Sequence, residues 1–208
     1  MLVSASFLGC ENPPDILKKL DVTDCDFIHV DVKDGRFVSG KTMPFKEMRN
    51  IYKYTSKRLD VHLMVEEASS FIQDYAGLNT EYITIHVESN HVLENLQLID
   101  SYHIKPGLAI CPDTPLQDIV PYLPLIKQIL IMSIEPGESG QAFIKEMEKK
   151  CIEARALLKE YKLDIIVSID GGVNNNTISY CKKCDMVVSC SYVINSDDFQ
   201  ERIDSLRR

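Results

Sequence analysis

The feature that most constrains this chain is a regular alternation of short apolar segments with longer segments of helical periodicity. Eight segments have the length and the β-branched, aliphatic composition of strands: 2–8, 26–32, 58–65, 82–87, 107–111, 128–133, 164–170 and 185–190. Segments with apolar residues at helical spacing follow them at 14–21, 45–55, 66–77, 90–101, 115–122, 142–161, 174–183 and 196–206. Repeated strand–helix units of this kind are typical of a parallel sheet.

Eight consecutive units predict a closed (β/α)8 barrel, a TIM barrel, because closure gives every parallel strand two neighbours and leaves no open edge. An open, doubly wound sheet is the second alternative. It is disfavoured because no Gly-x-Gly-x-x-Gly follows the first strand segment, as a dinucleotide-binding sheet would require. No linker rich in Pro, Gly or Ser divides the 208 residues. We therefore expect residues 1–208 to form a single barrel domain.

Charge, hydropathy and cysteine content argue against several classes of protein. The chain carries 23 Lys and Arg against 31 Asp and Glu, a formal net charge of −8. It shows no basic stripe, so we expect no nucleic-acid partner and no anionic membrane surface. The longest apolar run, near 129–134, is far shorter than the roughly 18 residues of a membrane span. Seven cysteines without a regular framework indicate a reducing compartment, and we expect a cytoplasmic protein.

Polar residues capable of chemistry gather late in the strand segments, where active sites of such barrels lie. They are Ser6, His29, Asp31, His62, His86 and Asp170. In the second segment, the alternation of side chains places His29, Asp31 and Lys33 on one face and aliphatic residues on the other. The aliphatic face would pack on the helices, so the polar row would point into the barrel. A buried polar row is costly unless a ligand, a metal or partner charges satisfy it.

Two imidazoles and two carboxylates would meet at one end of this barrel. His29 and Asp31 come from the second strand segment, His62 from the third and Asp170 from the seventh. A lone histidine is more often a hydrogen-bonded core residue than a ligand. Four ligand-type residues together favour a divalent-metal site, and nitrogen and oxygen donors of this kind suit Zn, Fe, Mn or Co.

Six stretches on the strand segments carry a more specific pattern. They are Ala5-Ser6-Phe7-Leu8, His29-Val30-Asp31-Val32-Lys33-Asp34-Gly35, Leu59-Asp60-Val61-His62-Leu63-Met64-Val65, Ile83-Thr84-Ile85-His86-Val87-Glu88, Met132-Ser133-Ile134-Glu135-Pro136-Gly137 with Gly140-Gln141, and Asp170-Gly171-Gly172-Val173. In this order they resemble the ribulose-phosphate 3-epimerase family, and the resemblance covers essentially the whole chain. The combination of His-x-Asp-x-x-Asp-Gly with Asp-x-His-Leu-Met-Val is highly specific.

The resemblance implies a metal held by His29, Asp31, His62 and Asp170, with the two aspartates also acting as the acid/base pair. Inverting the carbon next to a ketone needs a base on one face of the substrate and an acid on the other. A metal would stabilise the enediolate charge as a Lewis acid. The family further implies that the chain interconverts D-ribulose 5-phosphate and D-xylulose 5-phosphate, and that it forms a homo-oligomer.

Further residues are expected to contact the phosphorylated sugar. Ser6 and His62 would touch it directly. Met64 and Met132 would line the site with polarizable apolar surface, although simple core packing explains these methionines equally well. Backbone N–H groups after the sixth, seventh and eighth strand segments would hold the phosphate. The candidates are Gly137, Glu138, Ser139, Gly140, Gly171, Gly172, Cys190 and Ser191.

The expected pocket departs from the family's usual pattern at several positions. The departures are Lys33 in place of Met, Gly137-Glu138-Ser139-Gly140 in place of Gly-Phe-Gly-Gly, Cys190-Ser191 in place of Gly-Ser, and Arg36-Phe37-Val38-Ser39-Gly40 in place of His-Phe-Val-Pro-Asn. Glu138 would repel a phosphate unless its side chain turned outward. The metal ligands match the family while the substrate contacts are changed, so a different ketose phosphate, such as allulose 6-phosphate, is an alternative substrate.

Two other hypotheses follow from these departures. Lys33 could pair with Asp31, bind an oxyanion or compete with the metal. Asp31-Val32-Lys33 is also similar to the start of the Asp-x-Lys-x-x-Asp motif of related barrel decarboxylases, although position 36 is Arg. This similarity suggests a decarboxylase or aldolase that uses Lys33. The changed phosphate loops suggest instead a non-catalytic sugar-phosphate-binding barrel. The role of His86 stays open.

Overall fold

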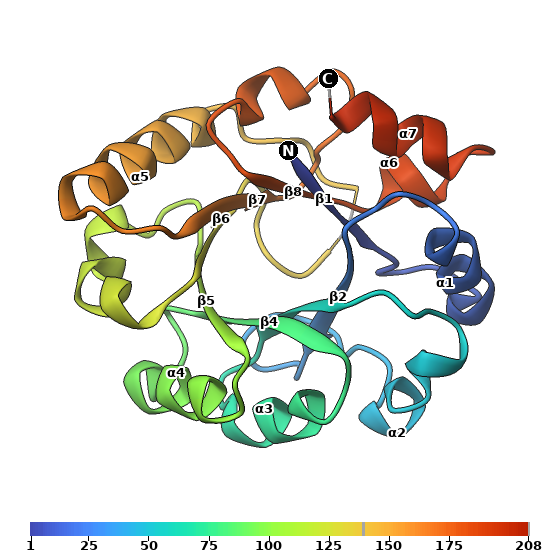
Figure 1. Ribbon diagram of the computed structural model, residues 1–208, viewed down its shortest axis with the longest axis horizontal. Coiled ribbons are helices and arrows are strands. Elements are labelled where there is room, and N and C mark those ends of the chain that lie inside the picture. Colours follow the sequence, from blue (N-terminus) through green and yellow to red (C-terminus); the bar gives the residue numbers. More distant parts are fainter. Residues whose placement is uncertain (139, 208) are drawn as a thin grey trace.

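The computed structural model describes residues 1–138 and 140–207, and eight parallel strands close into a barrel in the order β1 to β8. The strands are β1 Leu2–Ser6, β2 Phe27–Lys33, β3 Leu59–Met64, β4 Thr80–His86, β5 Lys105–Ile110, β6 Gln128–Met132, β7 Ile166–Asp170 and β8 Met186–Ser189. Strand β1 pairs with both β2 and β8, which closes the ring seen in Figure 1. The predicted (β/α)8 barrel is confirmed.

Helices surround the barrel on its outside (Figure 1). The α-helices are α1 Pro13–Asp21, α2 Phe45–Met48, α3 Ser69–Ala76, α4 Val92–Ser101, α5 Met147–Tyr161, α6 Ser191–Ile194 and α7 Phe199–Leu206, and the 3₁₀ helices are η1 Ile51–Lys53, η2 Leu116–Leu125 and η3 Ile178–Cys181. The main apolar core lies between the helices and the strands. It includes the outward-facing Ile28, Val30 and Val32 of β2, as the alternation along this strand predicts.

Three predicted helices differ from the observed ones. The segment predicted at 115–122 is the 3₁₀ helix η2, because Pro121 and Pro124 lie inside it and cannot donate α-helical hydrogen bonds. The segment at 174–183 contains only the short η3. There the side chains of Asn174 and Thr177 bond to the carbonyl oxygen of Gly172, which competes with helix formation. The segment at 45–55 is divided into α2 and η1.

The register between β2 and β3 assembles polar side chains inside the barrel. His29 lies opposite Asp60, and Asp31 lies opposite His62. Ser4 of β1 joins this group, because its Oγ donates a hydrogen bond of 2.8 Å to Asp60 Oδ2. Where the strands begin, Phe27, Tyr82 and Met186 form an apolar cluster, and the buried Gln128 donates a hydrogen bond of 3.0 Å to Ser168 Oγ. Asp31 and Asp170 lie instead near the ends of β2 and β7.

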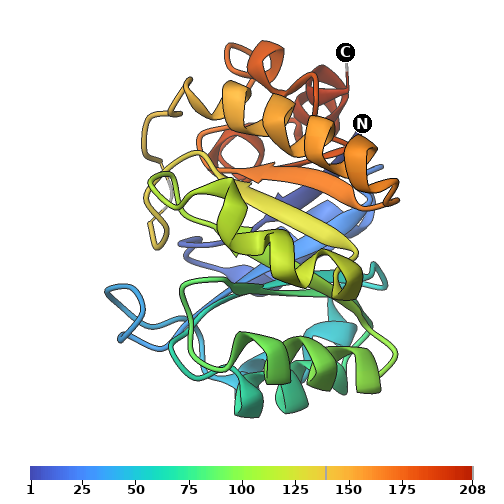
Figure 2. The ribbon, with the colours of Figure 1, turned by 90° about the vertical axis from the view of Figure 1, so that its left-hand side faces the viewer.

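The loops that follow β2 and β6 project from the same end of the barrel (Figure 2). They touch at Val38 and Gly137. Gly137 has a φ of +123°, and a Cβ atom at this position would lie 3.2 Å from the Cβ of Val38. A side chain at Gly137 would push the two loops apart, so this glycine permits their close approach.

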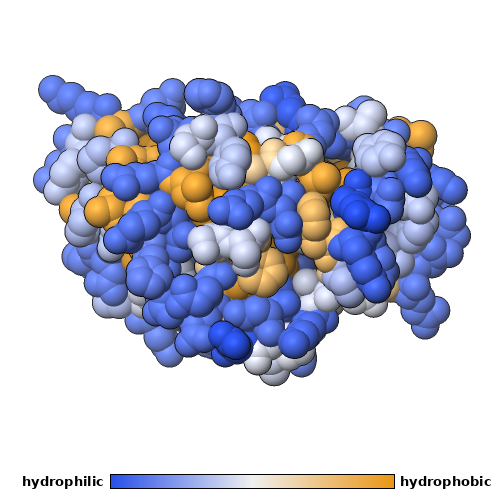
Figure 3. All heavy atoms as spheres, turned by 90° about the horizontal axis from the view of Figure 1, so that it is seen from below, coloured by the Kyte–Doolittle hydropathy of each residue, from blue (hydrophilic) through white to orange (hydrophobic). Residues whose placement is uncertain are grey.

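The outer surface is mostly hydrophilic. In the face shown in Figure 3, hydrophilic residues dominate and apolar side chains form small groups. Large exposed apolar residues such as Val22, Tyr52 and Ile152 come from separate parts of the chain, as is ordinary for a protein surface. Among the described residues, no helix is both long enough and apolar enough to cross a bilayer.

Candidate active site

Four side chains from three strands converge inside the barrel. They are His29, Asp31, His62 and Asp170, and one potential ligand atom from each lies within 4.8 Å of the other three. His29 Nε2 lies 3.4 Å from Asp31 Oδ1 and 3.7 Å from Asp170 Oδ2. His62 Nδ1 lies 3.3 and 3.6 Å from the same two oxygens. The structure thus brings together the four residues that the sequence predicts as metal ligands.

The ring nitrogens that face this centre lack hydrogen-bond partners. His29 Nε2 and His62 Nδ1 are buried and have none within the described parts of the chain. The other nitrogen of each ring is engaged: His29 Nδ1 lies 2.8 Å from Asp60 Oδ2, and His62 Nε2 lies 2.8 Å from His86 Nε2. A buried polar atom without a partner is costly. A divalent cation that accepted both lone pairs would remove this cost, so the residues present fit a metal of the Zn, Fe, Mn or Co type.

The electrostatics of the centre favour positive charge. Burial by itself would lower the pKa of His29, but the carboxylates of Asp31 and Asp60 outweigh it and raise this pKa well above its ordinary value. Burial alone would raise the pKa of Asp31, yet His29 and His62 hold it far below its usual range. A metal cation between the rings would offset the negative charge of these carboxylates, as a proton on either ring does.

His86, at the end of β4, extends this network away from the centre. Its Nδ1 lies 3.1 Å from Glu88 Oε2, and its ring meets the ring of His62 edge to edge, with the centroids 5.0 Å apart and the two Nε2 atoms 2.8 Å apart. Phe37 covers the ring, with a centroid distance of 4.6 Å. Burial lowers the pKa of His86 to about 4 against the opposing effect of Glu88, so the ring is neutral at pH 7.

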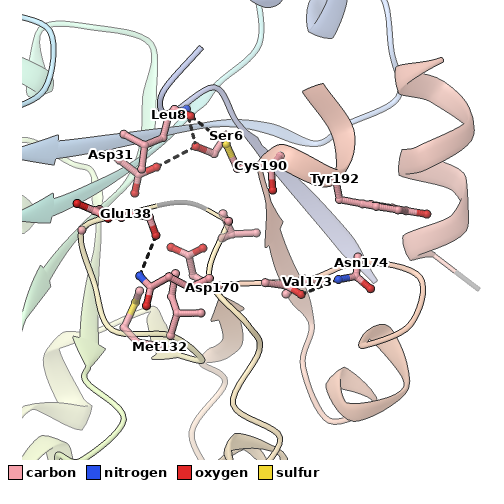
Figure 4. Close-up of a pocket in the computed structure, with 18 of the residues that line it drawn as sticks. Ser6, Leu8, Asp31, Met132, Glu138, Asp170, Val173, Asn174, Cys190 and Tyr192 are labelled. Atoms are coloured by element: carbon pink, nitrogen blue, oxygen red, sulfur yellow. Dashed lines mark hydrogen bonds between the residues drawn. The ribbon is translucent and has the colours of Figure 1, made fainter. Parts of the chain in front are cut away.

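A cavity of about 180 Å³ opens over the centre. Asp31 and Asp170 line it from different strands, and Figure 4 shows Ser6 and Cys190 beside them. Ser6 Oγ donates a hydrogen bond of 2.9 Å to Asp31 Oδ2. The predicted substrate-contacting residues that line the cavity are Ser6, Met64, Met132, Gly137, Glu138, Gly140, Gly171, Gly172, Cys190 and Ser191. Ser139, the remaining loop candidate, lies outside the described residues.

The structure adds residues that the sequence analysis did not select. The additional lining residues are Leu8, Ile134, Gln141, Val173, Asn174, Val188 and Tyr192. Strand alternation could have identified Val188, which is two residues before Cys190, and likewise Asp60, two residues before His62. Gln141, Asn174 and Tyr192 follow their strands in irregular or short segments, where no periodic pattern marks them.

Two consecutive glycines after β7 shape one wall of the cavity. Gly171 has a φ of +120° and Gly172 a φ of +64°. A Cβ atom on Gly171 would lie 2.4 Å from a side-chain carbon of Ile134, and one on Gly172 would lie 2.8 Å from the backbone nitrogen of Phe143. Both positions therefore require glycine. Glu138 is exposed at the cavity rim, and no Lys or Arg occurs among the described lining residues.

Comparison with known proteins gives relatives over nearly the whole chain. A sequence model described as "Ribulose-phosphate 3 epimerase family" matches residues 2–194. A curated ribulose-phosphate 3-epimerase from Helicobacter pylori is 37% identical, over 99% of this chain and 94% of its own length. The proteins of the same name from Synechocystis sp. and Escherichia coli are each 37% identical, over 92% and 88% of this chain and 85% and 83% of their own lengths.

Solved structures of other enzymes share the barrel. Phosphoribosyl anthranilate isomerase from Thermococcus kodakaraensis matches with a TM-score of 0.65 and 16% identity, over 99% of this chain and 96% of that one. A mutant tryptophan synthase alpha-subunit from Pyrococcus furiosus matches with a TM-score of 0.71 and 13% identity, over 99% and 97%. At such identities the likeness concerns the fold alone. The match over residues 2–194 and the relatives at 37% identity establish more: the chain belongs to the ribulose-phosphate 3-epimerase family.

Proposed function

We propose that the protein is a metal-dependent epimerase that inverts C3 of a ketose phosphate and interconverts D-ribulose 5-phosphate and D-xylulose 5-phosphate. The observation that carries the proposal is a pair of carboxylates, Asp31 and Asp170, which line one cavity beside two unpaired imidazole nitrogens. The names of the curated relatives support the choice of substrate.

The reaction removes a proton from one face of C3 and returns a proton to the other. Asp31 on β2 and Asp170 on β7 supply the two carboxylates, and after the first transfer the substrate is a planar enediolate. One of them, as the ionised base, takes the C3 proton, and the other, which enters the reaction as the protonated acid, delivers its proton to C3 from the opposite side. The hydroxyl of Ser6 donates to Asp31 Oδ2 at 2.9 Å and so orients this carboxylate for the transfer.

His29, Asp31, His62 and Asp170 would hold the divalent cation, of the Zn, Fe, Mn or Co type. When bound, the cation supplies Lewis-acid stabilisation of the negative charge that develops on the substrate oxygens. Asp60 orients the ring of His29 through a 2.8 Å contact at Nδ1, which leaves Nε2 directed to the centre.

The phosphate would lie against the backbone of Gly171 and Gly172, with Gly140, Cys190 and Ser191 beside it. Because the described lining residues include no Lys or Arg, backbone N–H groups would supply most of the recognition. Met64 and Met132 would face the carbon skeleton of the sugar.

The decisive experiment is hydrogen exchange at the substrate. Metal-loaded protein is incubated with ribulose 5-phosphate in D₂O, and the products are followed by NMR. We expect deuterium at C3 together with xylulose 5-phosphate. Exchange with allulose 6-phosphate but not with ribulose 5-phosphate would identify allulose 6-phosphate as the substrate instead. Binding of either sugar phosphate without exchange would contradict the enzyme and support a non-catalytic binding barrel.

We also propose that the enzyme works as a homo-oligomer in a reducing cytoplasm. Its seven cysteines are free thiols, which supports a reducing setting. Sedimentation equilibrium of the purified protein measures the oligomeric state.

A further inference from the structure

We propose that Glu88 and His86 are positioning residues that set the tautomer of His62, so that the lone pair of its Nδ1 faces the metal. The inference rests on the proposed function, because it takes His62 as a metal ligand. It starts from a chain of three contacts: Glu88 Oε2 lies 3.1 Å from His86 Nδ1, His86 Nε2 lies 2.8 Å from His62 Nε2, and His62 Nδ1 is unpaired.

The positions of the protons follow from what each atom can donate. A carboxylate only accepts, so the His86 nitrogen that faces Glu88, Nδ1, carries a proton. With one proton on the imidazole, His86 Nε2 has a lone pair and accepts. The nitrogen 2.8 Å away, His62 Nε2, must then be the donor. A neutral His62 protonated at Nε2 has its lone pair on Nδ1, the atom that faces Asp31 and Asp170.

The packing holds these groups in place. The side chains of His62 and His86 are both 0% exposed, and their ring planes are inclined by only 28°, so the two Nε2 atoms meet edge to edge. Glu88 is anchored through its other oxygen, which accepts hydrogen bonds from the backbone N–H of Cys111, at 2.9 Å, and from the hydroxyl of Thr114. The carboxylate therefore cannot turn away from His86 without losing partners on the segment that follows β5.

Cys111 offers the only competing group at His86 Nδ1 within the described residues. Its Sγ lies 3.7 Å from this nitrogen, against 3.1 Å for Glu88 Oε2. A thiol is a weak donor and a carboxylate is a strong acceptor, so the nitrogen keeps its proton toward Glu88. His86, Glu88 and Cys111 could alternatively hold a second metal ion, since their potential ligand atoms lie within 4.8 Å of one another. A second ion would break the relay, and the experiment below detects it.

The two histidine ligands have different partners on the side away from the metal, and this difference explains why only His62 needs a relay. His29 presents Nε2 to the centre, and Asp60 contacts its Nδ1 directly at 2.8 Å. His62 presents Nδ1 instead, and its Nε2 meets another imidazole. Through the ring of His86, the Glu88 carboxylate therefore determines which nitrogen of His62 carries the proton. Partners of this kind typically change metal affinity about 10- to 100-fold when removed.

The test compares full-length wild type with Glu88→Met, Glu88→Gln, His86→Phe and Thr114→Val. Imidazole ¹⁵N shifts of the metal-free proteins, recorded over a pH series that reaches the range in which the His62 ring is neutral, report its tautomer. Co²⁺ titration with its absorption spectrum reports affinity and stoichiometry. We expect wild type and Thr114→Val to show neutral His62 protonated at Nε2 and one Co²⁺ site. Glu88 uses both oxygens as acceptors, whereas Gln has one, so Glu88→Gln places an amide N–H either at His86 or at the Cys111 N–H and should shift the tautomer toward that of Glu88→Met. Thr114→Val removes a contact of Glu88 without touching the relay.

Glu88→Met and His86→Phe should show mixed tautomers of His62 and a Co²⁺ affinity about 10- to 100-fold weaker. Their epimerase activity should recover at saturating metal, with an unchanged KM for the sugar phosphate, because only metal binding is affected. His86→Phe keeps a ring in the packed position and serves if Glu88→Met fails to fold. Three results would overturn the proposal: a neutral His62 protonated at Nδ1 in the wild type, unaltered tautomer and affinity in both variants, or two equivalents of bound Co²⁺. If the tautomers behave as expected but no exchange occurs at C3, the proposed function fails and the relay stands.

Discussion

The ammonium of Lys33 donates a hydrogen bond of 2.7 Å to the carbonyl oxygen of Gly137, a residue 104 positions later in the chain. Lys33 ends β2, and Gly137 lies in the loop after β6 that borders the cavity. The bond therefore ties the end of β2 to a wall of the cavity. Because the ammonium is engaged in this bond, the structure does not favour a decarboxylase or aldolase in which Lys33 reacts. Lys33, which stands where the family usually has Met, has a structural role instead.

Replacing Lys33 by Met should leave kcat nearly unchanged and raise the KM for ribulose 5-phosphate about fivefold. The loop at Gly137 loses one charge-assisted hydrogen bond, which contributes about 1 kcal/mol at a half-buried site. Steady-state kinetics measure both constants, and Lys46→Met on the exposed face of α2 is the control. A complete loss of turnover would show that the ammonium takes part in the chemistry.

Asp170→Asn should abolish proton transfer at C3. An amide cannot act as a general acid or base at this position, and such groups contribute about 10²- to 10⁴-fold to rate. We expect a loss of this size both in epimerisation and in deuterium exchange at C3. Asp164→Asn, at an exposed position before β7, is the matched control and should keep wild-type rates. Exchange that survives in Asp170→Asn would remove Asp170 from the acid/base pair.

Metal removal should inactivate the enzyme and lower its Tm. Stripping the metal exposes the mutual repulsion of Asp31 and Asp170 and the unpaired nitrogens of His29 and His62. A ligand present at 100 times its Kd stabilises the folded state by about 2.7 kcal/mol, which thermal unfolding readily detects. Zn²⁺, Fe²⁺, Mn²⁺ and Co²⁺ should be tested for restored activity one at a time. Mg²⁺ prefers oxygen ligands and should restore little. Full activity after exhaustive chelation would contradict the metal site.

Gly172→Ala should destabilise the protein and weaken phosphate binding. The φ of +64° costs an alanine about 1–2 kcal/mol, and the added Cβ would lie 2.8 Å from the backbone nitrogen of Phe143. We expect a lower free energy of unfolding in urea and a higher KM for the sugar phosphate. The matched control is Gly77→Ala, where φ is −77° and the nearest atom to a Cβ is 3.7 Å away. This control should be neutral or stabilising by up to about 1 kcal/mol.

Glu81 should stabilise the fold in a pH-dependent way, far from the active site. Its carboxylate accepts hydrogen bonds of 2.6 Å from both Arg58 and Lys105. Burial by itself would raise the pKa of Glu81, but Lys105 and Arg58 outweigh it and lower the pKa below its ordinary 4.5. A lowered pKa means that the contribution is fully present above about pH 4.5 and is lost as the pH falls through the folded-state value.

Urea unfolding of wild type and Glu81→Gln measures this contribution. The difference in free energy of unfolding should be largest at pH 7 and should shrink at pH values below 4.5. Glu153→Gln, in an exposed pair with Lys149 at 3.8 Å, should change stability little at either pH. An equal effect of Glu81→Gln at pH 7 and at low pH would contradict the assignment.

The amino-acid sequence by itself determined the barrel and the inward-facing ligand set. Strand alternation has a period of two that follows from backbone stereochemistry, so the face shared by His29 and Asp31 could be read directly from their spacing. The register of β2 with β3 then places His62 opposite Asp31. The predicted convergence of four ligand-type residues depended only on these regular features, and the structure contains it.

Only the tertiary structure decided which nitrogen of each histidine faces the centre, where the ammonium of Lys33 goes, and how the loops border the cavity. His62 presents Nδ1 because His86 occupies its other side, and Lys33 reaches a carbonyl 104 residues away. Ring rotation and loop conformation have no period along the chain. They are set by packing between segments that meet only when the barrel closes, and so no local pattern in the sequence could determine them.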